Sequence, residues 1–103
     1  MSDYENMTLR PHARLIILKA LAAQPDERLH TDYIQKELMR FLIDRPRAWV
    51  HGELDWLAEM GAVTLLKPDG ASVWVATLTD KGARHLRRSI AIEGVDRPSR
   101  PGE

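Results

Sequence analysis

The sequence contains no cysteine. This absence excludes a disulfide scaffold, thiolate catalysis and thiolate-bound zinc, so the fold must rest on apolar packing. Long hydrophobic runs are also missing, since no apolar stretch approaches the ~20 residues that a membrane-spanning helix needs. Asp3 and Glu5 near the start differ from the basic front of a secretion signal. We therefore expect a cytoplasmic protein with no membrane partner.

The chain also has no net charge. Fifteen Lys and Arg residues balance fifteen Asp and Glu residues, so no large positive field attracts the molecule to phosphate backbones. This balance disfavours strong nonspecific binding to nucleic acid. The charges are unevenly placed, because residues 81–88 carry four basic side chains and no acidic one, whereas residues 53–59 carry three acidic side chains.

Features typical of catalytic sites are absent from the sequence. No Ser-His-Asp arrangement, phosphate-cradling glycine loop or paired-carboxylate cleft can be identified. The histidines come from separate segments without metal-ligand spacing: His12, His30, His51 and His85. Residues 51–53 match the His-x-Glu of zinc deaminases, but that chemistry also needs two cysteine ligands. We therefore expect no enzyme, no metal site and no cofactor.

The pattern that is present is an alternation of helices and short strands within the length of one small domain. Val50, Leu54 and Leu57 recur at helical spacing, and Gly61 is typical of a helix end. Two strands follow at 62–66 and 72–78, separated by a Pro- and Gly-containing turn. Thr79 then offers an N-cap for another helix.

Residues 8–49 supply two further helices and a strand. Thr8 is expected to cap the first helix, which ends before Pro25. A short strand at 28–30 precedes a second helix capped by Thr31, and Asp44 is expected to cap the third helix, with Pro46 in its first turn. These boundaries predict a domain over residues 8–92.

The two ends of the chain lack the apolar pattern of the middle. Residues 1–7 show no repeating apolar positions and predict a flexible leader. Residues 93–103 contain Pro, Gly and charges, with only Val95 apolar, and predict a flexible tail.

The segment "LDWLAEMGAV", followed by a short hairpin and "LTDKGARHL", resembles winged-helix transcription regulators over their recognition helix, wing and following helix. This resemblance implies an α+β winged helix-turn-helix, with a three-helix core, a two- or three-stranded wing and a C-terminal helix. The segment "IEGVDRPSRPG" directly after such a body is similar to a family of small proteins of Mu-like phages and prophages. That family has no established activity to carry over.

In winged helices the third helix enters the DNA major groove, and the wing approaches phosphate or the minor groove. The resemblance therefore implies these DNA-contacting positions: Arg45, Arg47, Ala48, His51, Gly52, Asp55 and Lys67. The alternative is that Arg45 and Arg47 are solvated charges at a helix start, since Asp55 and its acidic neighbours would repel phosphates. Lys67 could likewise belong to a plain turn, because Asp69 offsets its charge.

A second candidate surface is apolar. Trp49, Trp56 and Met60 form a stripe on the third helix, which either completes the core, with Trp56 packed against Trp74, or serves a dimer or partner interface. The basic residues of the last helix could also serve dimerisation, or could stabilise a helix end: Arg84, Arg87 and Arg88.

These features favour a phage or prophage regulator of transcription that binds double-stranded DNA as a homodimer. Two protomers would double a weak electrostatic contact and set two recognition helices at one-turn spacing. The alternative is a protein-interaction module whose acidic and aromatic third helix binds a phage or host protein. A third interpretation, an inert component of a phage particle, has no positive feature in the sequence.

Overall fold

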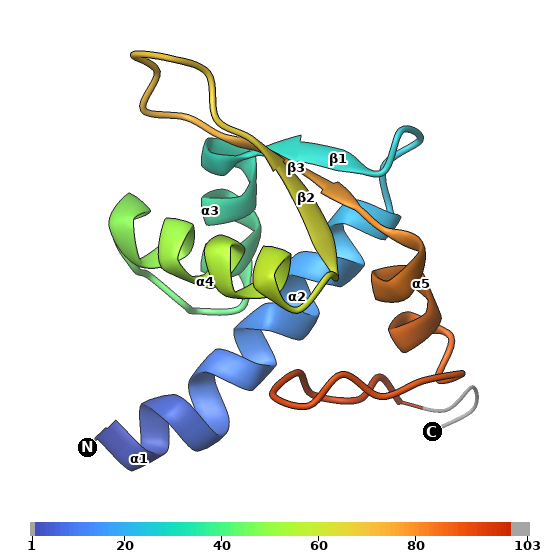
Figure 1. Ribbon diagram of the computed structural model, residues 1–103. Helices are drawn as coiled ribbons and strands as arrows, with labels where there is room; N and C mark the ends of the chain where they lie inside the picture. The colour runs from blue at the N-terminus through green and yellow to red at the C-terminus, as the bar shows by residue number, and fades with distance from the viewer. Residues whose placement is uncertain (1, 100–103) are drawn as a thin grey trace.

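The computed structural model describes residues 2–99, and its chain starts with one long helical stretch (Figure 1). Helix α1 (Ser2–Tyr4), a π-helical turn η1 (Glu5–Leu9) and helix α2 (Arg10–Ala22) follow one another directly. The backbone stays right-handed and helical at both junctions, Tyr4 and Leu9. This differs from the expected leader at 1–7, and Thr8 lies inside the helix instead of capping it. Residue 1 lies outside the described residues.

The helix-turn-helix follows. Strand β1 (Arg28–His30) leads into helix α3 (Thr31–Arg40), and helix α4 (Arg47–Glu59) comes after a short turn. Both predicted caps are wrong, because His30 and Pro46 occupy the N-cap positions in place of Thr31 and Asp44. The extended backbone of His30 and Pro46 is the conformation that an N-cap adopts, and the Thr31 hydroxyl bonds Trp74 instead.

The wing is a three-stranded antiparallel sheet with the order β1-β3-β2. Strand β2 (Val63–Leu66) pairs with β3 (Val75–Leu78) from Val63↔Leu78 to Leu66↔Val75, and β1 pairs with the other edge of β3. Helix α5 (Asp80–Leu86) begins as predicted, since the Thr79 hydroxyl accepts the Gly82 amide at 3.1 Å. The predicted α+β winged helix-turn-helix is thus confirmed, with three strands in its sheet.

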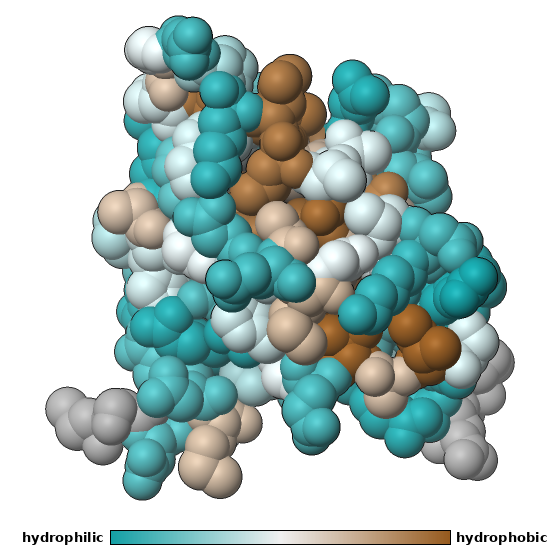
Figure 2. Space-filling model, viewed as in Figure 1, coloured by the Kyte–Doolittle hydropathy of each residue, from teal (hydrophilic) through white to brown (hydrophobic). Residues whose placement is uncertain are grey.

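The core lies where α2, α3 and α4 meet one face of this sheet. The helices contribute these fully buried apolar side chains: Ile17, Leu18, Leu21, Ile34, Leu38, Val50, Leu54 and Leu57. The sheet adds Val63, Ala76 and Leu78. Figure 2 shows that hydrophilic residues dominate one face of the molecule, whereas hydrophobic residues on it gather beside the sheet and, in a smaller group, near the C-terminal segment. Packing of these apolar faces is what fixes the orientation of α4.

The segment after α5 returns along α2, and its residues 93–99 do not form the extended tail that we expected (Figure 1). Ile92 and Val95 are buried, and the Asp96 amide donates to the Pro11 carbonyl at 3.1 Å. The buried His85 ring accepts the Ile92 amide at Nδ1, so its Nε2 donates to the Asp96 carbonyl at 2.8 Å. These bonds supply the ordering that the composition did not predict. Residues 100–103 lie outside the described residues.

Within residues 2–99, no helix combines the length and the apolar character needed to cross a membrane.

Candidate nucleic-acid interface

The solvent-facing side of α4 changes character along its length. Ala48 and Gly52 are exposed in its N-terminal half, and Asp55 and Glu59 are exposed in its C-terminal half. Apart from the local backbone of α4 and the adjacent residues, no heavy atom of the described chain lies within 4 Å of the position that a Cβ on Gly52 would take. The N-terminal half therefore presents an open surface that a duplex could approach closely, and we call Ala48 and Gly52 the small-residue face.

Arg47 stands at the start of α4 and is held from two sides. Its guanidinium lies 2.8 Å from the Asp32 carboxylate of α3 and donates to the Ser72 hydroxyl, in the loop before β3, at 3.1 Å. Arg45 lies further away from the wing, where its guanidinium is 3.9 Å from Glu5 and 5.7 Å from the centre of the Trp49 ring. Arg47 thus faces the wing, whereas Arg45 faces the N-terminal helix.

Lys67 also turns toward α4. Its Nζ lies 2.8 Å from the Asp55 carboxylate and 4.2 Å from the centre of the Trp74 ring. Asp55 and Lys67, predicted separately as DNA contacts, are therefore partners of each other. This ion pair connects the residue directly after β2 with α4.

His51 fills the space between these two ion pairs. Its imidazole stacks on Trp74, with ring centroids 3.7 Å apart and an interplanar angle of 5°, and its Nε2 lies 2.9 Å from the Thr31 hydroxyl. Burial, followed by the positive charge of Arg47, lowers the pKa of His51 below its ordinary value of 6.5, against an opposing effect of Asp55. The neutral ring is the form that suits this stacked position.

We call the contact layer between α4 and the wing the wing clasp, formed by Asp32, Arg47, His51, Asp55, Lys67 and Trp74. The structure brings four of the seven predicted DNA-contacting residues into this layer and leaves Arg45, Ala48 and Gly52 outside it. Sequence reasoning missed Asp32 and Trp74 as members. The spacing of His51 and Asp55 signals a shared helix face, but no signal connected that face to Asp32 or Trp74.

The predicted aromatic stripe is half buried. Trp49 donates its indole N–H to Glu5 at 2.9 Å. Trp56 lies under the Arg14 guanidinium, 3.7 Å from the ring centre, and beside Gly94. The expected packing of Trp56 on Trp74 is wrong, since Trp74 stacks on His51 instead. Met60 also packs against the core.

The predicted basic residues of the last helix have separate contacts. Arg84 pairs with Asp80 one turn earlier, at 2.8 Å. Arg88 has a left-handed backbone, with φ of 65°, and donates to the Pro98 carbonyl. Arg87 is exposed. Arg84 and Arg88 thus bind other residues of the C-terminal part of this chain.

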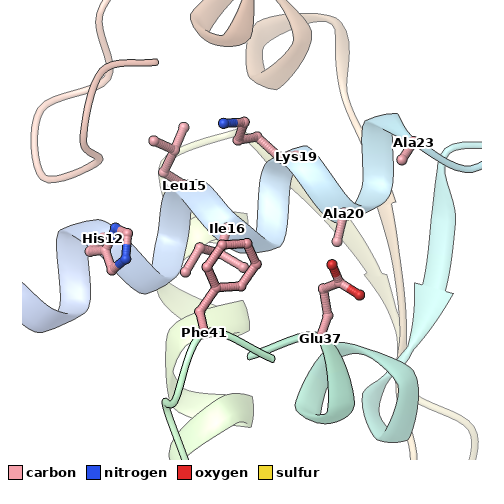
Figure 3. Close-up of a pocket in the computed structure, with 8 residues that line it drawn as sticks. All are labelled: His12, Leu15, Ile16, Lys19, Ala20, Ala23, Glu37 and Phe41. Atoms are coloured by element: carbon pink, nitrogen blue, oxygen red, sulfur yellow. The ribbon is translucent and has the colours of Figure 1, made fainter. Parts of the chain in front are cut away.

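A shallow pocket opens between α2 and the end of α3 (Figure 3). Its lining is mostly apolar, with Leu15, Ile16 and Ala20 of α2 and with Phe41, and it also includes Lys19 and Glu37. Across residues 2–99, no three His, Asp or Glu side chains gather closely enough to hold a metal ion.

No family model and no curated protein matches the sequence. Two solved structures are similar to it. A MarR-family transcriptional regulator from Streptomyces coelicolor is 28% identical with a TM-score of 0.57, over 70% of this chain and 46% of that one. A second MarR-family regulator from the same organism, determined in complex with DNA, is 22% identical with a TM-score of 0.52, over 85% of this chain and 62% of that one.

The matches therefore span about half to three fifths of those regulators. Both are transcriptional regulators. This chain therefore has a winged-helix fold similar to that of these two MarR-family regulators.

Proposed function

We propose that the protein is a transcriptional regulator that binds duplex DNA, with α4 in the major groove and the β2–β3 wing beside the phosphates. One observation carries the proposal: the small-residue face of α4 is open, and Arg47 and Lys67 lie on its wing side. Small residues allow close approach to base edges, and cations at the border position the backbone. A regulator of the same fold was determined bound to DNA, which supports this role.

The proposal includes a homodimer. The whole chain has a net charge of zero, so one protomer offers few cations to a duplex. Two protomers double that number and place two recognition helices one helical turn apart, roughly 34–36 Å. The C-terminal segment "IEGVDRPSRPG" adds the proposal that this regulator comes from a phage or prophage and acts in the cytoplasm.

The test is a fluorescence-anisotropy titration of the full chain with a mixed-sequence duplex at two salt concentrations, with light scattering to count subunits. Binding that weakens steeply with salt supports the proposal. Ala48→Glu should abolish binding, because it places a carboxylate on the small-residue face. Ala22→Glu is the matched control, since it adds the same side chain at an exposed position near the end of α2.

Two outcomes would contradict the proposal. Equal loss of binding in both glutamate variants would remove the small-residue face from the interface. Absence of binding by the unaltered protein at low salt would favour the interaction-module alternative, in which the exposed Asp55 and Glu59 face a basic protein surface. The aromatic stripe supports that alternative less, because Trp49 and Trp56 already contact Glu5 and Arg14.

A further inference from the structure

The two cations beside the small-residue face are both neutralised by carboxylates of this chain. Arg47 pairs with Asp32 and Lys67 with Asp55, each at 2.8 Å. All four side chains remain between 41% and 54% exposed. Ion pairs this open to water are worth only about 0–1 kcal/mol each, so another anion can replace the carboxylate.

Each cation also has a second contact that does not depend on its carboxylate. The Ser72 hydroxyl accepts from Arg47 at 3.1 Å, and the Trp74 ring lies 4.2 Å from the Lys67 ammonium. Ser72 and Trp74 are separate from the aspartates. We therefore expect them to keep Arg47 and Lys67 near the wing when an aspartate no longer pairs with its cation. The charged groups are thus already positioned at the border of the face where a duplex would lie.

Negative charge lies beside the two cations on the exposed side of α4. His51 lies between the two pairs, and burial, followed by the positive charge of Arg47, lowers its pKa and so favours the uncharged ring. Asp55 and Glu59 give this side of α4 exposed negative charge, which repels phosphates unless it is offset. The wing clasp therefore holds the cations that attract DNA together with the carboxylates that oppose it.

We propose that Asp32 and Asp55 are specificity-determining residues: they neutralise Arg47 and Lys67 in the free protein, and DNA phosphates replace them on binding. This inference rests on the proposed DNA-binding function. Each exchange returns one carboxylate to water and adds one phosphate contact, so the electrostatic gain from arbitrary DNA is reduced. Base-edge contacts at the small-residue face then carry a larger share of the total affinity. The aspartates lower affinity for any sequence in order to preserve discrimination between sequences.

The test compares Asp55→Asn with Glu59→Gln in the full chain, using anisotropy with a mixed-sequence duplex over a range of salt. Both substitutions remove one negative charge from the exposed side of α4. Of these two carboxylates, only that of Asp55 forms an ion pair within residues 2–99. Asp55→Asn should raise affinity at low salt about threefold to tenfold and steepen the slope of log K against log salt by about one unit. Glu59→Gln should produce a clearly smaller rise and leave the slope unchanged.

Two further variants make the result specific to the pair. Adding Lys67→Gln to Asp55→Asn should abolish the gain, because no freed cation remains. Asp32→Asn should act like Asp55→Asn through Arg47, which gives a second, independent site.

Three results would overturn the inference. A gain for Asp55→Asn no larger than that for Glu59→Gln would show a general charge effect, as would a gain that persists with Lys67→Gln. In both cases DNA binding itself stands. No binding by the unaltered protein or by any variant would instead overturn the proposed function and this inference with it.

Discussion

The imidazole of His51 lies flat on the indole of Trp74, with ring centroids 3.7 Å apart and planes within 5°. His51 belongs to α4, and Trp74 precedes β3, so the stack joins α4 to the wing. A double-mutant cycle of His51→Ala and Trp74→Ala should give a coupling free energy of about 0.5–1.5 kcal/mol. Urea denaturation of the four proteins measures it. Strictly additive losses would show that the stack contributes nothing beyond the burial of each ring.

Protonation of His51 should destabilise the folded protein. The folded-state pKa is lowered by burial and by Arg47, so the unfolded chain binds the proton more readily. Stability should therefore be complete above pH about 6.5 and should fall as the pH decreases from there through the lower folded-state pKa. Thermal unfolding of the unaltered protein and of His51→Gln between pH 7.5 and 5.5 tests this. His51→Gln should lose less stability over that range, and identical pH profiles would contradict the assignment.

Local rules predicted the order of elements correctly. The spacing of Val50, Leu54 and Leu57 and the Thr79 cap depend on residues within one or two turns, and the structure confirms both features. The three-stranded sheet followed from short β-rich runs and a turn. Such signals are contained in neighbouring residues, so a single sequence reveals them.

Apart from the helix caps, the differences between expectation and structure involve contacts between distant residues. Glu5 accepts the Trp49 indole N–H from 44 positions away, which ties the N-terminal helical stretch to α4. His85 orders the C-terminal segment through two backbone groups. The ion pair between Lys67 of the wing and Asp55 of α4 is likewise not indicated by the residues next to either one in the sequence. Composition and periodicity describe how each segment folds, but they do not say which segments meet.

Glu53 should be essential for stability although it lies on the same helix as exposed acids. Its carboxylate is 1% exposed and accepts from Arg14 Nε at 2.7 Å and from Arg10. Glu53→Ala leaves the largely buried Arg14 guanidinium without its carboxylate and should cost about 3–5 kcal/mol. Urea denaturation measures the cost. Glu59→Ala, at an exposed position of α4, should change stability by only about 0.5 kcal/mol, and equal losses would contradict the role of the buried ion pair.

Gly82 and Gly52 should respond oppositely to alanine. A Cβ on Gly82 would lie 2.4 Å from the Ala62 carbonyl oxygen and 2.7 Å from Leu78 Cδ1, whereas nothing lies within 4 Å of one on Gly52. Gly82→Ala must therefore push α5 away from the residues before β2 and should cost about 1–3 kcal/mol. Gly52→Ala should stabilise α4 by about 0.5–1 kcal/mol. Thermal unfolding separates the two, and stabilisation by Gly82→Ala would show that α5 moves freely.

Gly94 should determine whether the C-terminal segment stays docked. Its φ is +94°, and a Cβ there would lie 2.6 Å from the Trp56 ring, which is covered on one face by Arg14. Gly94→Ala should therefore displace the segment and expose the Asp96 amide, which donates to the Pro11 carbonyl. Amide hydrogen exchange at Asp96 reports this directly, and exchange should become faster in the variant.

Gly70→Ala is the matched control for this displacement. Gly70 has a similar φ of +73°, but beyond its two chain neighbours no heavy atom of residues 2–99 lies within 4 Å of its Cβ position. Both variants carry the backbone strain of a left-handed alanine, roughly 1–2 kcal/mol, and only Gly94→Ala adds a collision with Trp56. Faster exchange at Asp96 in Gly94→Ala alone would therefore assign docking to the close approach of backbone and indole. If the Asp96 amide exchanges equally fast in both variants, docking of the C-terminal segment depends on global stability. The contact with Trp56 would then have no separate role.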